Sequence, residues 1–162
     1  MILVNFNRSF HFSLKEKRDD MKISAKCEYA CRAVLELSLQ FRGNVPIQLQ
    51  TIADNQNIPE KYLVQILLQL KGAGFVASIR GKEGGYYLTK PPNKITLGEI
   101  IREIDGPLLS INSADNSTES ARILKGIWQN LESSISRIVD NTNFEEISNE
   151  VERLKAAGIY YI

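Results

Sequence analysis

Histidine and cysteine, which supply many general bases and metal ligands in proteins, are almost missing from this chain. Its 162 residues include one histidine, His11, and two cysteines, Cys27 and Cys31. A single histidine in the leading segment does not form a group of catalytic side chains. The glycine-rich residues 81–85 lie between two strand-like runs rather than at the start of a helix, where a phosphate loop would stand. We therefore expect no enzyme.

Long apolar runs are missing as well. No stretch approaches the roughly 18 apolar residues that a membrane helix needs, and residues 1–12 lack the sustained apolar core of a secretion signal. The two cysteines are too few for a disulfide framework, and their i, i+4 spacing on a helix is a poor geometry for a mutual bridge. With 43% apolar residues the chain has ordinary material for a core. We expect a soluble, cytoplasmic protein with no membrane partner.

Residues 59–71 carry apolar side chains at helical spacing. The predicted buried face consists of Tyr62, Leu63, Ile66, Leu67 and Leu70. The predicted outer face consists of Glu60, Lys61, Val64, Gln65 and Lys71. Pro59 suits the first turn of such a helix, because a missing N–H costs nothing there.

Two runs rich in β-branched and aromatic residues follow, at residues 75–80 and 86–90, and a glycine-rich segment separates them. This pattern predicts a two-stranded hairpin in which Arg80 stands at the beginning of the tip and Lys82 lies within it. A helix with a polar outer face followed by a short basic hairpin is typical of a winged helix. Such a helix lies in the major groove of DNA, and the arginine of the wing reaches the minor groove.

Residues 80–88, Arg-Gly-Lys-Glu-Gly-Gly-Tyr-Tyr-Leu, closely resemble the Arg-Gly-x-x-Gly-Gly-Tyr wing of the Rrf2 family of bacterial winged-helix transcription regulators. The resemblance spans roughly residues 21–142. It includes residues 29–33 as the first helix, 52–53 in the second, 62–67 in the recognition helix and 100–106 in the next. It implies a mainly α fold with a small β-hairpin wing: a winged helix-turn-helix DNA-binding domain followed by a long C-terminal dimerisation helix.

We expect four parts along the chain. Residues 1–20 do not match the family; they are either a genuine extension or the result of a start placed too far upstream, and we favour Met21 as the cellular start. Residues 21–106 form the winged helix-turn-helix domain, and residues 107–120 form a polar loop. Residues 121–162 hold the dimerisation helix and a last amphipathic helix. Thr96 and Glu99 predict a capping box at the start of a helix over residues 97–104.

The helix predicted over residues 121–140 has apolar residues at alternating spacings of four and three. They form an a/d seam made of Leu124, Trp128, Leu131, Ile135 and Ile138. A narrow seam on a helix outside the small winged domain favours contact with a second subunit. Packing against its own domain is the alternative.

Candidate DNA contacts follow from position. For the major groove they are Pro59, Glu60, Lys61, Val64 and Gln65, where Gln65 suits an adenine and Val64 a thymine methyl group. The resemblance makes Arg80 the minor-groove residue, and the candidate phosphate contacts are Lys22, Lys26, Thr51 and Lys82. Residues 57–94 hold six basic and two acidic residues, whereas residues 107–162 hold five basic and eight acidic ones. The family commonly has a glutamate at the position of Val64, so no target sequence is carried over.

Many members of the family hold an iron–sulfur cluster through three cysteines in the loop after the position of Gly106. Residues 107–120 contain no cysteine, so we expect no cofactor and no metal at that place. Cys27 and Cys31 are interpreted as small core residues; the alternative is a bridging site between subunits, because two thiols from one chain do not complete a four-ligand site.

The resulting hypothesis is a homodimeric transcriptional regulator, a repressor that binds a roughly palindromic operator without a cluster. Its partners would be double-stranded DNA, a second copy of the chain, and a regulatory protein or small-molecule effector. Two alternatives remain: a protein-interaction module with a degenerate winged helix, and a cluster or redox sensor with atypical ligands.

Overall fold

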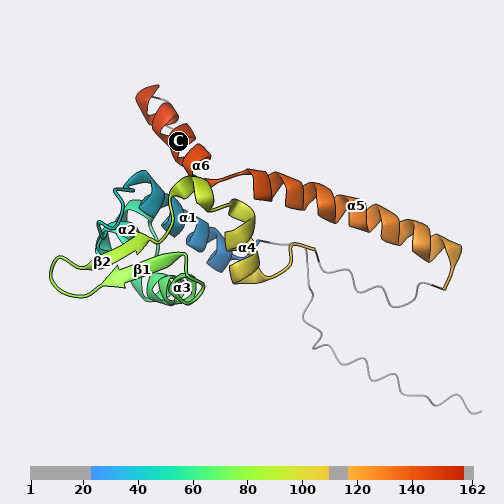
Figure 1. Ribbon diagram of the computed structural model, residues 1–162, viewed down its shortest axis with the longest axis horizontal. Coiled ribbons are helices and arrows are strands. Elements are labelled where there is room, and N and C mark those ends of the chain that lie inside the picture. Colours follow the sequence, from blue (N-terminus) through green and yellow to red (C-terminus); the bar gives the residue numbers. More distant parts are fainter. Residues whose placement is uncertain (1–22, 110–116, 159–162) are drawn as a thin grey trace, which may run out of the picture.

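The computed structural model describes residues 23–109 and 117–158, and these form a helical body with a long arm (Figure 1). His11 and Lys22 lie outside the described residues. The elements, in chain order, are α1 (Ala25–Leu39), α2 (Leu49–Gln56), α3 (Glu60–Gly72), β1 (Val76–Ile79), β2 (Gly85–Leu88), the 3₁₀ helix η1 (Pro92–Lys94), α4 (Leu97–Asp105), α5 (Glu119–Asn141) and α6 (Phe144–Ala156). The predicted mainly α fold with a hairpin wing is confirmed.

The helices begin where polar side chains satisfy their first backbone N–H groups. The Ser24 hydroxyl accepts from the backbone N–H of Cys27 at 3.0 Å, and α1 follows. Thr96 and Glu99 form the expected capping box at the start of α4. Asn143 accepts from the N–H of Glu146 at 3.0 Å and starts α6. Helix α1 ends at Leu39.

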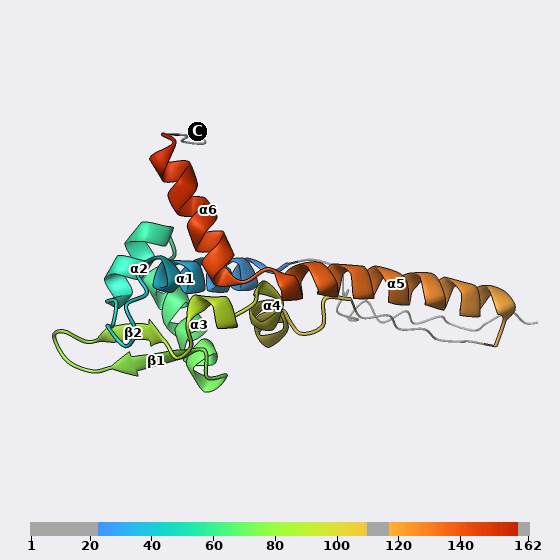
Figure 2. The same cartoon turned by 45° about the horizontal axis from the view of Figure 1, so that its top comes forward.

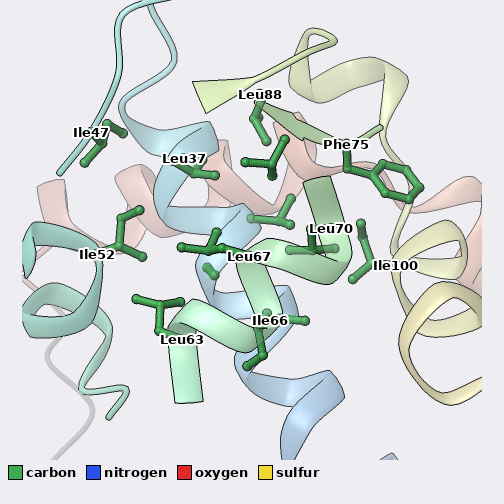
Figure 3. Close-up of a cluster of buried hydrophobic side chains, with 14 of the residues drawn as sticks. Leu37, Ile47, Ile52, Leu63, Ile66, Leu67, Leu70, Phe75, Leu88 and Ile100 are labelled. Atoms are coloured by element: carbon green, nitrogen blue, oxygen red, sulfur yellow. The ribbon is translucent and has the colours of Figure 1, made fainter. Parts of the chain in front are cut away.

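The core lies where the inner faces of α1 and α3 meet α2, α4 and the hairpin (Figure 3). Helix α3 contributes the fully buried Leu63, Ile66, Leu67 and Leu70. The prediction that Tyr62 belongs to this face is wrong, since its side chain is 42% exposed. Tyr62 lies on the flank of α3, where its ring meets that of Tyr29 edge to face at a centroid distance of 5.8 Å.

The hairpin pairs β1 and β2 antiparallel, from Val76 opposite Leu88 to Ile79 opposite Gly85. The segment before α2 adds a short third edge, because Ile47 and Tyr86 exchange two backbone hydrogen bonds of 2.8 Å. This close approach requires Gly85, whose φ is +156° and at which a Cβ atom would lie 2.2 Å from the Ile47 carbonyl oxygen. The wing is therefore joined to the body at its base.

Helix α5 leaves the body as the arm, and α6 runs in a different direction from the same junction (Figure 2). The junction is fixed by backbone bonds from Leu97 to the Thr142 carbonyl at 2.9 Å and from Phe144 to the Ile95 carbonyl at 3.0 Å. Arg102 of α4 also pairs with Asp140 of α5. Within the described ranges, no helix has both the length and the apolarity needed to cross a membrane.

Candidate nucleic-acid interface

The contacts of α3 define which of its sides is open. On one flank Gln69 accepts from the Lys26 ammonium at 2.5 Å and donates to the Glu103 carbonyl at 2.8 Å, so this flank faces α1 and α4. On the other flank the Lys71 ammonium donates to the Ser78 hydroxyl of β1 at 2.6 Å. The side between these flanks is directed away from the body.

The predicted major-groove residues lie at the start of α3 and along its open side. Pro59 is the N-cap residue and is exposed. Glu60, Lys61 and Gln65 are exposed as well, whereas Val64 is half-buried. Among the described residues, none forms an ion pair or a side-chain hydrogen bond with Lys61 or Gln65. Their polar groups are therefore available to a partner outside the chain.

The hairpin of β1 and β2 lies beside α3 (Figure 1), and its tip carries two cationic residues. Arg80 and Lys82 are both exposed and follow directly on the end of β1. The tip is closed by a hydrogen bond from Gly84 N–H to the Gly81 carbonyl at 3.0 Å. Gln48 Nε2 donates to the Lys82 carbonyl at 3.3 Å and connects the tip to the beginning of α2.

Two candidate phosphate contacts occupy less open positions. Lys26 is half-buried, and its ammonium is engaged by Gln69. Thr51, in the first turn of α2, is half-buried and lines an open groove next to Gln48. A DNA contact by either residue stays a prediction.

Leu68 is a residue of α3 that the sequence prediction left out. Its side chain is 52% exposed and lies on the open side of the helix. The signal was present in the sequence, because a face made of residues 63, 66, 67 and 70 leaves position 68 on the opposite side.

Helix α5 exposes the predicted a/d seam. Leu124, Trp128, Leu131 and Ile138 are between 38% and 64% exposed, and Ile135 is half-buried. Ile123 and Ile127, which were not predicted, are also exposed and widen the apolar face near the outer end of the arm. We call these seven residues the α5 apolar face. Large contiguous apolar surfaces that are exposed are typical of interaction sites.

The two cysteines lie next to each other on the inner side of α1. Cys27 is fully buried against Ile101 and Val139, and Cys31 is half-buried beside it; both are free thiols. A hydrogen bond from Cys27 to Cys31 raises the pKa of the Cys27 thiol and lowers the pKa of the Cys31 thiol.

One chain supplies fewer thiolate donors than the four that an iron–sulfur cluster commonly takes. In the described part of the chain, no group of three or more His, Cys, Asp or Glu side chains is placed to hold a metal ion. The whole chain has only two thiolate donors, and both stand on α1.

Comparison with known proteins gives consistent results. The family model named Rrf2, described as an iron-dependent transcriptional regulator, matches residues 23–150. The HTH-type transcriptional regulator CymR of Bacillus subtilis is 34% identical over 142 residues, which cover 88% of this chain and all of that protein. The HTH-type transcriptional regulator IscR of Aliivibrio salmonicida is 32% identical over 139 residues, which cover 83% of this chain and 82% of IscR.

Two solved structures have a fold similar to that of this chain. The structure of CymR, the global cysteine regulator of B. subtilis, superposes with a TM-score of 0.70 at 34% identity and covers 80% of this chain and 97% of its own. The structure of T. potens IscR superposes with a TM-score of 0.68 at 32% identity and covers 87% of this chain and 93% of its own.

Proposed function

Because the chain belongs to the Rrf2 family of transcriptional regulators, and is therefore a regulator and not an enzyme, we propose that it is a homodimeric repressor that needs no iron–sulfur cluster. In this proposal α3 enters the major groove of the operator, and the wing reaches the adjacent minor groove. The dimer represses by occupying promoter DNA.

One observation carries the DNA-reading part of the proposal: the open side of α3 and the exposed Arg80 lie on neighbouring elements of the body. The residues there have the chemistry of DNA recognition. Lys61 and Lys82 can neutralise phosphates, and Gln65 can form a bidentate pair with adenine. An arginine at a wing tip suits a narrow, A·T-rich minor groove, where the negative potential is strongest.

The α5 apolar face supports the homodimer. Its side chains are exposed apart from the half-buried Ile135, and they lie on an arm that projects from the body (Figure 1). A two-fold axis across the paired arms would place two copies of α3 on two half-sites of a roughly palindromic operator.

The cysteine count supports a regulator without a cluster. Members that hold a cluster need thiolates in the loop after α4, and residues 107–120 have none. Regulation would then come from a regulatory protein or a small-molecule effector.

The test is the binding of the purified, metal-free full chain to its own upstream promoter region over a range of salt concentrations. We expect tight binding that resists competitor DNA and weakens steeply with salt, because several phosphate contacts release counterions. Arg80→Ala should weaken binding by about tenfold, equivalent to about 1.4 kcal/mol. Arg122→Ala, an exposed arginine on α5, serves as the matched control and should bind as the wild type does.

Each outcome separates the candidate functions. Equal binding by Arg80→Ala and the wild type would contradict the role of the wing. The absence of any specific binding by the folded, metal-free chain would favour the protein-interaction module. Binding that appears only after anaerobic loading with iron and sulfide would favour the sensor with atypical ligands.

A further inference from the structure

The open side of α3 has an outermost row of side chains. Tyr62 and Gln69 mark the flank toward α1 and α4, and Lys71 marks the flank toward the hairpin. Midway between these flanks, at spacings of four and three residues, the helix presents exposed side chains on successive turns. This outer row consists of Lys61, Gln65 and Leu68.

Leu68 is not needed for the fold. The four buried residues of α3 complete its inner face, and Leu68 points away from them with about half of its surface exposed. One exposed leucine on a protein surface is ordinary. This one lies in the same row as a glutamine and a lysine on the proposed recognition helix. It also lies one turn after the half-buried Val64, so the two form a continuous aliphatic edge.

Resting on the proposed function, we propose that Leu68 contacts the C5-methyl group of a thymine in the major groove, next to the base pair that Gln65 reads. The thymine methyl is the apolar group among the polar atoms that base pairs present in this groove, and aliphatic side chains recognise it. Adenine presents N6 and N7 to a glutamine in the same groove. The amide of Gln65 and the aliphatic side chain of Leu68 therefore match the adenine of one A·T pair and the thymine methyl group of its neighbour.

The three residues of the outer row thus have different roles in the proposed complex. Lys61, nearest the start of α3, neutralises a phosphate and fixes the position of the helix. Gln65 reads an adenine through hydrogen bonds, and Leu68 reads a methyl group through apolar contact. Cytosine at the position of the thymine lacks the methyl group, and the half-site consequently discriminates against it.

The test uses duplexes that the full chain enriches from a random 30-base-pair library. Each thymine of the enriched site is replaced in turn by deoxyuridine, which keeps the base pair and removes only the methyl group. For the wild type we expect each half-site to contain one sensitive thymine, and the replacement of that single thymine should weaken binding about fourfold, the effect of burying one methyl group. Leu68→Ala should bind the thymine and deoxyuridine duplexes equally.

Val45→Ala is the matched control, because Val45 is another exposed aliphatic residue and lies outside α3. This variant should keep the wild-type sensitivity to deoxyuridine. The inference is overturned if no thymine replacement weakens wild-type binding, or if Leu68→Ala keeps the same sensitivity at that thymine. A selection that enriches no sequence at all overturns the proposed function instead, so the two failures are distinguishable.

Discussion

The carboxylate of Asp105, the last residue of α4, accepts two hydrogen bonds from Ser24, the residue that caps α1. One comes from the Ser24 backbone N–H at 2.8 Å and the other from its hydroxyl at 2.5 Å. The same hydroxyl accepts from the Cys27 N–H. A negative charge at the beginning of a helix is also favourable for the helix dipole. Asp105 therefore connects the end of one helix to the start of another that lies 81 residues away in the chain.

We expect Asp105→Ala to lower the free energy of unfolding by about 1–2 kcal/mol, because it removes both of these hydrogen bonds and frees the capping serine. Urea denaturation followed by circular dichroism measures the change. Glu83→Ala, which removes an exposed carboxylate from the wing tip, is the control and should leave stability unchanged. Equal stability of the two variants would show that the connection contributes nothing.

Glu36 is a buried carboxylate that accepts hydrogen bonds from amides rather than from a cation. Asn55 Nδ2 and Gln56 Nε2 each donate to it at 2.7 Å, and they join α1 to the end of α2. Glu36→Ala should cost about 2–3 kcal/mol of stability, since it leaves these amides without their acceptor. Glu28→Ala on the exposed side of α1 should cost less than about 1 kcal/mol, as its ion pair with Arg32 is at the surface. Thermal denaturation of both variants checks the contrast.

Gly85→Ala should weaken DNA binding and destabilise the hairpin. Its Cβ atom would collide with the Ile47 backbone, which a small side-chain movement does not relieve. Gly126→Ala gives the opposite expectation: this glycine lies inside α5 with open space around it, and alanine favours the helix by about 0.5–1 kcal/mol. Stability and operator affinity of both variants should be measured together. A Gly85→Ala variant that binds normally would contradict the requirement for the close approach to Ile47.

The two thiols should differ in reactivity. Because the hydrogen bond from Cys27 lowers the pKa of Cys31, Cys31 is deprotonated at a lower pH than an ordinary thiol, and the thiolate is the reactive form. At neutral pH iodoacetamide should therefore modify Cys31 faster than Cys27, whose pKa is raised and whose side chain is fully buried. Mass spectrometry of partly modified protein identifies the site.

The variants Cys27→Ala and Cys27→Ser test the cause of this difference. Cys27→Ala removes the donor, so the pH profile of Cys31 modification should move to higher pH. Cys27→Ser keeps a hydroxyl donor and should retain more of the low-pH reactivity. Identical profiles for the wild type and Cys27→Ala would contradict the assignment.

Leu131→Glu should dissociate the proposed dimer, because it places a charge in the α5 apolar face that a partner would bury. Gln129→Glu introduces the same charge on another side of α5 and should leave the assembly intact. Sedimentation equilibrium of the wild type and both variants gives the masses. A wild-type monomer at micromolar concentration would contradict the homodimer.

The sequence predicted the elements whose signals are local. Thr96 with Glu99 identified a helix start, and the glycines around Arg80 identified the hairpin. Tyr62 was assigned to the core because helical periodicity counts a tyrosine as apolar, whereas its ring lies at the flank against Tyr29.

Other features depend on contacts between distant segments, which periodicity does not reveal. The engagement of Lys26 by Gln69 and the connection of Gln48 to the wing both join elements that are far apart in sequence. The width of the α5 apolar face was underestimated because a strict a/d pattern excludes Ile123 and Ile127. The predicted DNA contacts and the division of the chain into four parts stay predictions.

The wing is held at three places: Ile47 bonds to β2, Gln48 bonds to the tip, and Lys71 of α3 bonds to Ser78 of β1. These bonds make the hairpin and α3 one unit. In the proposed complex, the separation between the base edges that α3 would read and the minor groove that Arg80 would reach is therefore set by the protein. A duplex would have to supply the matching groove geometry, so we expect sequences that adopt it at low deformation energy to be favoured even at base pairs that no side chain touches.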